Sequence, residues 1–141
     1  MESMVSTIPL ISIVDDDLSV RRSLRRLVQS AGYAVATFAS AREFLDSTAL
    51  ALAACVVLDI SMEGMSGFDL QAQLASSLPL LPIIFITALD DAATRERFRR
   101  SGVAEMLRKP FDEHALFRAI TRALDQGPID QGPIDGPGRV Q

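Results

Sequence analysis

The stretch AACVVLDISMEGMSGF, residues 53–68, decides the fold of this chain. Its apolar run at 55–58 is too short for a helix and does not alternate with polar residues, which predicts a strand buried on both faces. Asp59 follows the run directly, and a loop with two glycines then allows a sharp turn before helical spacing resumes. Asp59 is therefore predicted at the carboxyl end of a central strand, the edge where open α/β sheets bind ligands.

Four further apolar runs of strand length lie on either side of this stretch, and each of the five is followed by residues with helical spacing. The predicted strands besides 55–58 are 9–14, 33–38, 83–86 and 105–108, and the predicted helices are about 18–31, 41–47, 68–78, 92–100 and 112–124. This alternation predicts an α/β fold, a doubly wound three-layer sandwich of the flavodoxin-like kind. Its parallel five-stranded sheet is expected to have the order 2-1-3-4-5.

The composition predicts one globular domain with a spare segment. Of 141 residues, 48% are hydrophobic and 23% charged, and the net charge of -4 argues against a nucleic-acid surface. Cys55 is the only cysteine, which suits a reducing compartment. The sequence shows no signal peptide and no apolar run near the ~20 residues that a membrane helix needs, so it predicts a cytoplasmic protein without membrane contacts.

The two ends of the chain are predicted to lie outside the folded domain, which covers residues 9–125. Residues 1–8 are expected to form a flexible N-terminus. Residues 126–141 read QGPIDQGPIDGPGRVQ, a Gly- and Pro-rich pentapeptide repeated once, and a stretch of this composition forms no core. A mobile tail, the stump of a linker and a tether for a partner all remain open.

Polar side chains follow four of the five predicted strands, and parallel strands end at the same edge of a sheet. These residues are Asp15, Asp16, Asp59, Thr87 and Lys109. In the order 2-1-3-4-5 the first and third strands are neighbours ~4.8 Å apart, so Asp16 and Asp59 can meet. Such close carboxylates need a cation, and two or three of them with a backbone carbonyl are typical of a Mg²⁺ site. Asp59 is then a candidate nucleophile for an acyl phosphate, with the Lys109 ammonium and the Thr87 hydroxyl binding the phosphoryl group.

Basic side chains elsewhere are interpreted mainly as solvated surface. Lys109 is the one lysine among the fourteen Lys and Arg residues of the chain. The arginines at 21, 22, 25 and 26 fall on the outer face of the first helix, and His114 is interpreted as a surface helix residue rather than a ligand. The arginines of the helix at 92–100 fit a partner surface and a solvated face equally well.

Four motifs, taken together and in this order, resemble the receiver domain of two-component response regulators. They are IVDDD at 13–17, VVLDISMEGMSG at 56–67, FITA at 85–88 and RKPF at 108–111, and the resemblance covers Pro9 to about Leu124. The resemblance implies a protein that takes a phosphoryl group from the phosphohistidine of a histidine kinase. It also implies that the phosphorylated form remodels the face made by the helix at 92–100, the strand at 105–108 and the helix that follows.

The same resemblance implies three roles in phosphotransfer. Asp59 is the phosphoacceptor, Thr87 is the switch hydroxyl, and Lys109 is the amine that pairs with the phosphate. The peptide bond between Lys109 and Pro110 is expected to be cis. Such a protein is no enzyme beyond its own phosphorylation and dephosphorylation.

The resemblance further implies the Mg²⁺ ligands and the partners. Asp16 binds the ion directly and Asp15 through water, with Asp59 and the backbone carbonyl of Ser61 as further ligands, while Asp17 caps the helix that follows. The expected partners are a sensor histidine kinase or phosphotransfer protein and a downstream protein target. A homodimer that depends on phosphorylation is also open.

The sequence departs from the family pattern at several positions. Glu63 stands where a proline is usual, which predicts a looser loop, and Met106 replaces the Phe or Tyr that swings with the switch threonine. Ser61 and Leu89 occupy positions from which the family influences the hydrolytic water, and neither carries an acid or an amide. The aspartyl phosphate is therefore predicted to be long-lived.

Two other functions are alternatives. Haloacid-dehalogenase-like phosphatases use the same residue types, but their nucleophile follows the first strand and has a second aspartate two residues on, where this chain has Ser61. A pseudo-receiver would keep the fold and bind a partner without phosphotransfer. Only the short tail follows the domain, so we expect either a single-domain regulator or a receiver from a longer protein.

Overall fold

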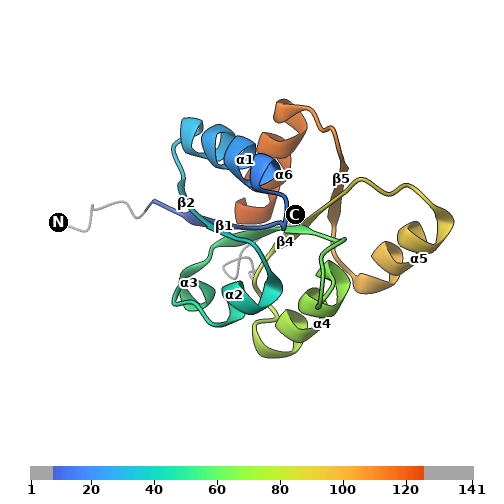
Figure 1. Ribbon diagram of the computed structural model, residues 1–141. Helices are drawn as coiled ribbons and strands as arrows, with labels where there is room; N and C mark the ends of the chain where they lie inside the picture. The colour runs from blue at the N-terminus through green and yellow to red at the C-terminus, as the bar shows by residue number, and fades with distance from the viewer. Residues whose placement is uncertain (1–7, 126–141) are drawn as a thin grey trace, which may run out of the picture.

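The computed structural model describes residues 8–125, and Figure 1 shows them as a central sheet between two layers of helices. Five parallel strands form this sheet in the order β2-β1-β3-β4-β5. The strands are β1 (Leu10–Val14), β2 (Ala34–Phe38), β3 (Cys55–Asp59), β4 (Ile83–Thr87) and β5 (Glu105–Arg108). The predicted doubly wound fold and its strand order are confirmed.

Six helices, one more than predicted, connect the strands within residues 8–125. They are α1 (Leu18–Ser30), α2 (Ala41–Leu45), α3 (Ala49–Leu52), α4 (Gly67–Ser77), α5 (Ala92–Ser101) and α6 (Glu113–Asp125). The extra helix, α3, has four residues, and the side chain of Thr48 before it makes no cap hydrogen bond. A single apolar turn without a cap is indistinguishable in sequence from the apolar residues around it, so the prediction of five helices was wrong at this point.

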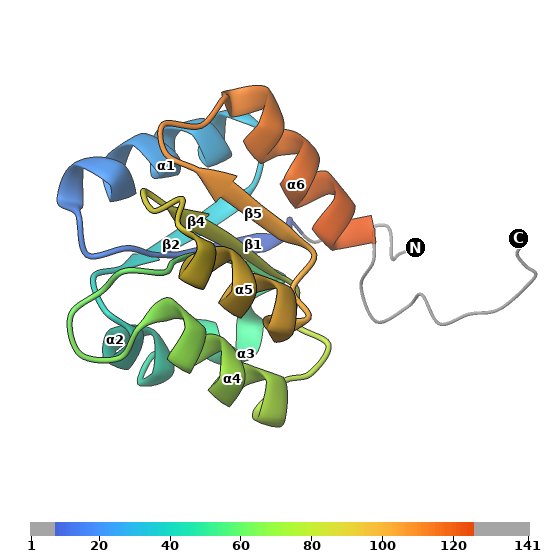
Figure 2. The same cartoon turned by 90° about the vertical axis from the view of Figure 1, so that its right-hand side faces the viewer.

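The helices divide into two layers around the sheet. Figures 1 and 2 show α1 and α6 on one face and α2 to α5 on the other. All five residues of β3 are buried. Its side chains alternate between the two cores, with Cys55 and Val57 in the core under α1 and α6, and Val56 and Leu58 in the core under the other helices. The prediction of a strand buried on both faces is confirmed.

Short polar side chains begin the helices that follow the strands. Asp17 accepts hydrogen bonds from the backbone N–H groups of Ser19 and Val20 and so caps α1, as the sequence predicts. Asp91 accepts from the N–H of Thr94 at the start of α5. These caps fix the points at which the loops after β1 and β4 end, and both loops belong to the edge of the sheet that carries the polar residues.

The predictions for the ends of the chain fall almost wholly outside the described residues. The flexible N-terminus at 1–8 overlaps them only at Ile8, whose side chain is exposed, and the tail or linker stump at 126–141 lies beyond them. Within the part of the chain that the structure describes, none of the helices combines the length and the apolar character needed to cross a bilayer.

Candidate functional site

Three carboxylates gather at the carboxyl edge of the sheet. The register that pairs Val14 of β1 with Leu58 of β3 brings the two strand ends level. Asp15, Asp16 and Asp59 each offer a carboxylate oxygen, and these oxygens lie within 4.8 Å of one another. Asp15 is 0% and Asp59 3% exposed, whereas Asp16 is exposed. We call these three residues the acidic cluster, and the predicted meeting of Asp16 with Asp59 is borne out.

Lys109 reaches the acidic cluster from the end of β5. Its Nζ donates a hydrogen bond to Asp15 Oδ2 at 3.0 Å and lies 3.5 Å from Asp59 Oδ1. The peptide bond between Lys109 and Pro110 is cis, as expected. Burial opposes the charge on Lys109, but its hydrogen bond to Asp15 and the charges of Asp59 and Asp15 outweigh this and raise its pKa. The ammonium therefore stays charged beside the cluster.

Asp59 lies in surroundings that disfavour its negative charge. Burial and the charge of Asp15 raise its pKa to about 6, against the lowering effects of Lys109 and of the Ser61 N–H, which donates to Asp59 at 3.4 Å. A cation among the carboxylates would relieve this repulsion. Carboxylate oxygens at this spacing are ligands that a hard divalent ion accepts, so the residues present fit the predicted Mg²⁺. The Ser61 carbonyl stays a predicted ligand.

The carboxylate of Asp15 is held from two sides. Its Oδ1 accepts a hydrogen bond from the Asp17 N–H at 2.9 Å, while Oδ2 accepts from Lys109. The backbone N–H of Asp15 donates to the carbonyl of Phe38 at 3.1 Å. With both carboxylate oxygens bound to the protein, Asp15 suits the indirect role that the sequence predicts for it more than that of an open ligand.

Thr87 ends β4 beside the acidic cluster. Thr87 pairs in register with Arg108 on β5. The residue before it, Ile86, pairs with Asp59 on β3. The buried hydroxyl of Thr87 accepts a hydrogen bond from the Leu89 N–H at 2.9 Å. A hydroxyl accepts and donates at once, so its proton is available to a group bound at the cluster.

Gly67 lets the loop after Asp59 fold back against its own strand. A Cβ at this position would lie 2.3 Å from the carbonyl oxygen of Asp59, and the Gly67 N–H donates to the Ile60 carbonyl at 2.8 Å. The turn itself uses Gly64, which has a φ of +79°. Gly64 is thus required for the backbone conformation of the turn, and Gly67 for the close packing of the loop on β3.

Arg21 contacts the site although the sequence placed it on a solvated helix face. Its Nη1 donates to the backbone carbonyl of Asp15 at 2.7 Å, and the side chain is half-buried. The prediction is therefore wrong for Arg21, while the arginines at 22, 25 and 26 are exposed as predicted. The only available signal was position, because Arg21 stands in the first turn of the helix after the acidic run.

Asp90 joins the loop after Thr87 to its two neighbouring elements. Its carboxylate pairs with Arg95 of α5 and with Arg108 of β5, each at 2.8 Å. Nothing in the sequence indicates these two ion pairs. Asp90 thus links the loop after Thr87 to β5, the strand that Lys109 follows.

Two further predicted residues lie away from the acidic cluster. Met106 is partly buried on β5, opposite Phe85 in register, and packs against the core under α2 to α5. Its part in switching stays a prediction. His114 is exposed on α6, in agreement with its interpretation as a surface residue.

Comparisons with known proteins agree with this geometry. A sequence model for the response regulator receiver domain matches residues 11–121. Nodulation protein W of Bradyrhizobium diazoefficiens is 40% identical over 121 residues, which are 86% of this chain and 53% of that protein. The solved structure of the response regulator StyR is 44% identical with a TM-score of 0.77, over 86% of this chain and 61% of that one. Chemotaxis protein CheY4 of Vibrio cholerae is 28% identical with a TM-score of 0.76, over 84% of this chain and 100% of that one.

The chain spans about half the length of the curated relatives it matches. The shared part is the folded unit that carries the acidic cluster, Thr87 and Lys109.

Proposed function

This chain belongs to the response regulator receiver domain family of two-component signalling, and from that premise we propose that it accepts a phosphoryl group on Asp59. The observation that carries the proposal is the placement of the Lys109 ammonium 3.0 Å from Asp15 and 3.5 Å from Asp59. Among residues 8–125 it is the one cation that forms ion pairs with carboxylates of the acidic cluster, those of Asp15 and Asp59. A metal cation among the carboxylates and the Lys109 ammonium would together offset the charge of an anionic group bound there.

The proposed step uses three side chains. A carboxylate oxygen of Asp59 attacks the phosphorus of a phosphohistidine, the P–N bond of the donor breaks, and the imidazole leaves and takes up a proton from solvent. The Lys109 ammonium pairs with the phosphoryl oxygens, and the Thr87 hydroxyl donates a hydrogen bond to one of them. The raised pKa of Lys109 supports this role because it keeps the amine charged.

Asp16, Asp59 and the Ser61 carbonyl would hold Mg²⁺, with Asp15 contributing through water. When bound, the ion would offset the negative charge of the carboxylates and of the phosphoryl group. Support comes from the donor set itself, which consists of three clustered carboxylates, and from the raised pKa of Asp59.

The proposed partners are a sensor histidine kinase or a phosphotransfer protein as donor and a downstream protein as target. We place the target on the face of α5, β5 and α6. Thr87 lies directly before the loop that leads into α5, and Lys109 lies between β5 and α6. The bridge from Asp90 to Arg95 and Arg108 supports this choice, since it connects the Thr87 loop to both α5 and β5. Pairing of two phosphorylated chains through this face is a second form of the same proposal.

The aspartyl phosphate is proposed to be long-lived, and the chain to turn over no external substrate. Ser61 and Leu89 flank the site on the exposed side, and neither side chain can act as a base toward water. A slow loss of the phosphoryl group in Mg²⁺ buffer would agree with this, whereas loss as fast as the phosphorylation itself would contradict it. Release of phosphate from a phosphate ester would instead favour the dehalogenase-like phosphatase.

Phosphoramidate, which carries the same P–N bond as phosphohistidine, tests the proposal directly. We expect the ¹H–¹⁵N spectrum of the full chain with Mg²⁺ to shift at Thr87, Lys109 and along α5 and β5 after its addition. Asp59→Asn should abolish the shifts, while Asp46→Asn, an exposed acid at the end of α2, should keep them. Identical spectra with and without phosphoramidate would favour the pseudo-receiver.

A further inference from the structure

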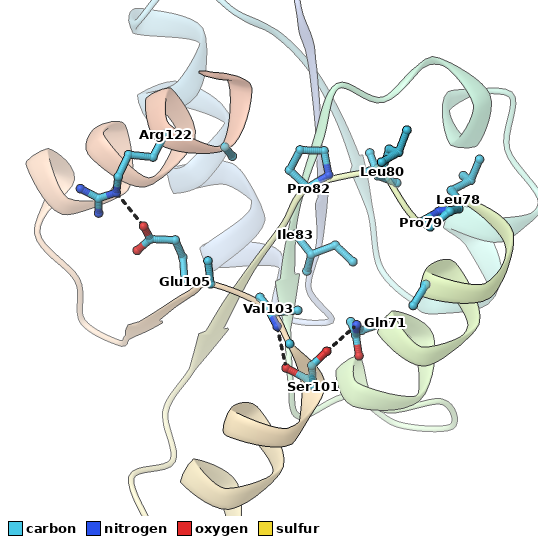
Figure 3. Close-up of a pocket in the computed structure, with 15 residues that line it drawn as sticks. Gln71, Leu78, Pro79, Leu80, Pro82, Ile83, Ser101, Val103, Glu105 and Arg122 are labelled. Carbon is cyan, nitrogen blue, oxygen red and sulfur yellow. Dashed lines mark hydrogen bonds and ion pairs between the residues drawn. The ribbon is translucent and has the colours of Figure 1, made fainter. Parts of the chain in front are cut away.

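An apolar groove lies at the amino edge of the sheet, opposite the acidic cluster. Two adjoining hollows of about 360 and 460 Å³ share the loop at 78–82 and Ala123, and we call them together the basal groove. Figure 3 shows the first hollow, where Pro79, Leu80 and Pro82 lie across from Glu105 and Arg122. The proposed phosphotransfer uses no part of this region.

The groove exposes a surface that water does not favour. Its shared loop reads LPLLP, five apolar residues in succession, and the side chain of Leu80 is 64% exposed. The second hollow continues this surface with Leu50 and Leu124. Exposed apolar surface of this continuity marks a place where another apolar segment docks, since covering it is favourable by roughly 25 cal/mol per Å².

We propose that the chain's own segment 126–141 docks in the basal groove. The segment begins at the groove, because Ala123 and Leu124 line it and Asp125 ends α6 immediately before the segment. A segment tethered at the edge of its site binds at an effective concentration on the order of millimolar, so modest contacts suffice.

The sequence of the segment suits this surface. The unit Gly-Pro-Ile-Asp occurs at 127–130 and again at 132–135, so the segment offers two isoleucines to two adjoining hollows. In an extended proline-rich conformation these isoleucines lie about 15 Å apart, at ~3.1 Å per residue. Proline has no N–H, so such a segment brings fewer unpaired donors into an apolar groove than other sequences do.

The charges of the segment have counterparts beside the groove. A third hollow between α4 and α5 shares Gln71, Ala75 and Ser101 with the basal groove and is also lined by Arg97 and Arg100. Both arginines are exposed and form only long ion pairs within the domain, Arg97 with Asp69 at 3.9 Å and Arg100 with Glu96 at 3.4 Å. Each Ile of the repeat is followed by an aspartate, Asp130 or Asp135. Exposed ion pairs contribute little affinity. We therefore assign the affinity of the segment to its isoleucines, and its orientation in the groove to its aspartates.

A spin label on the segment tests the proposal in the full-length chain. Gln131→Cys provides the attachment site, because the native thiol of Cys55 is buried and will not react. We expect the label to broaden the amide signals of Leu80 and Val103 at the groove and to leave those of Asp16 and Ser61 at the opposite edge sharp. Ile129→Asp with Ile134→Asp should remove the broadening, whereas Gln126→Asp with Gln141→Asp adds the same charge and should retain it.

Two outcomes would overturn the proposal. Sharp signals at Leu80 and Val103 in the labelled chain would mean that the segment does not occupy the groove. Broadening that appears in a mixture of unlabelled ¹⁵N chain with spin-labelled ¹⁴N chain would mean that a second copy supplies the contact. Leu80→Asp gives an independent check from the other side, since this exposed position tolerates the change and the added charge should release the segment.

Discussion

At the carboxyl edge of the sheet, two buried carboxylates share one lysine, whereas at the amino edge a loop of leucines and prolines lies in contact with water. The same five parallel strands end at both edges. Each edge therefore holds the groups that a fold selected for stability alone would place elsewhere. The contrast teaches that the sheet supplies the rigid frame and that its two edges are where the chain departs from maximal stability to bind something.

The departures differ in kind. At the carboxyl edge the unfavourable contribution to the free energy of folding is electrostatic, because Asp59 is buried beside Asp15. A cation bound there would relieve this repulsion. At the amino edge the term is hydrophobic and would be relieved by an apolar segment. Substitutions at the two edges should therefore change stability in different ways and by different amounts.

Gly67→Ala is expected to have the largest effect, a loss of about 3–4 kcal/mol in the free energy of unfolding, because the new methyl group would meet backbone atoms that cannot move aside. The contact is with the Asp59 carbonyl oxygen at 2.3 Å. Urea denaturation measures the loss. Gly64→Ala is the matched control, since nothing lies within 4 Å of its Cβ and only the positive φ opposes it, at a cost of about 1 kcal/mol. Equal losses at both glycines would contradict the close packing of the loop on Asp59.

Asp59→Asn is expected to stabilise the metal-free protein above pH 6. The pKa of about 6 in the folded protein lies above the ordinary aspartate value of 3.8, so the unfolded chain gives up its proton first as the pH rises. Wild type thus loses stability between about pH 4 and pH 6 relative to the variant, by about 2–3 kcal/mol in total, and the difference stays constant at higher pH.

Thermal or urea unfolding of both proteins in chelator from pH 4 to pH 8 measures this difference. Asp46→Asn, at an exposed site, should follow wild type at every pH. A difference between Asp59→Asn and wild type that does not change with pH would show that burial does not act through the charge of Asp59.

Lys109→Met is expected to lower the free energy of unfolding by about 1–2 kcal/mol, because the buried carboxylate of Asp15 loses one of its two hydrogen-bond donors. The lysine side chain is 21% exposed, and solvent compensates part of the loss. Lys109→Arg keeps the charge and should lose less. If Met and Arg at this position were equally stable, the ion pair at the carboxyl edge would have no measurable value.

Leu80→Ser is expected to have the smallest effect, about 0.5 kcal/mol or less, since Leu80 packs little against residues 8–125 and a weakly docked segment adds few contacts. Leu74→Ala, in the core under α4, should cost about 3 kcal/mol in the same urea titration. A loss at Leu80 as large as that at Leu74 would mean that the loop at 78–82 is part of the hydrophobic core and not a surface for a weakly docked segment.

Much of the fold can be predicted from the sequence, because the hydrophobic periodicity of each element and the residues at its boundaries indicate the same structure. Each strand is an apolar run that stops at a polar residue, and the alternation of strands and helices predicts a parallel sheet. The order 2-1-3-4-5 is one of the two common orders of such sheets, and the alternation alone does not select it. The exception is α3, which is one turn long and has no cap, so neither periodicity nor a boundary residue distinguishes it. Residues 49–52 look like a continuation of the apolar region before β3.

The candidate site is readable as far as its residues stand directly at strand ends. Four of them stand at strand ends: Asp15, Asp59, Thr87 and Lys109. Lys109 is also conspicuous as the single lysine of the chain. Contacts that depend on side-chain reach are not readable in this way. Arg21 donates to the Asp15 carbonyl while the arginines at 22, 25 and 26 are exposed, and only its place in the first turn of α1 distinguishes it in the sequence.

The basal groove was also beyond sequence reasoning. Its loop at 78–82 reads as an ordinary connection closed by two prolines. The loop becomes one wall of a groove only in the tertiary structure, which brings the end of α6 against it. A hollow formed by three distant segments has no signature in any one of them.

The measurement that tests the central claim most directly is the intact mass of the full chain after incubation with acetyl phosphate, with and without Mg²⁺. We predict a single phosphoryl adduct that requires Mg²⁺, is absent from Asp59→Asn and persists in Asp46→Asn. An adduct of equal yield in Asp59→Asn, or no adduct in wild type under any condition, would contradict the assignment of the carboxyl edge as a phosphoacceptor site.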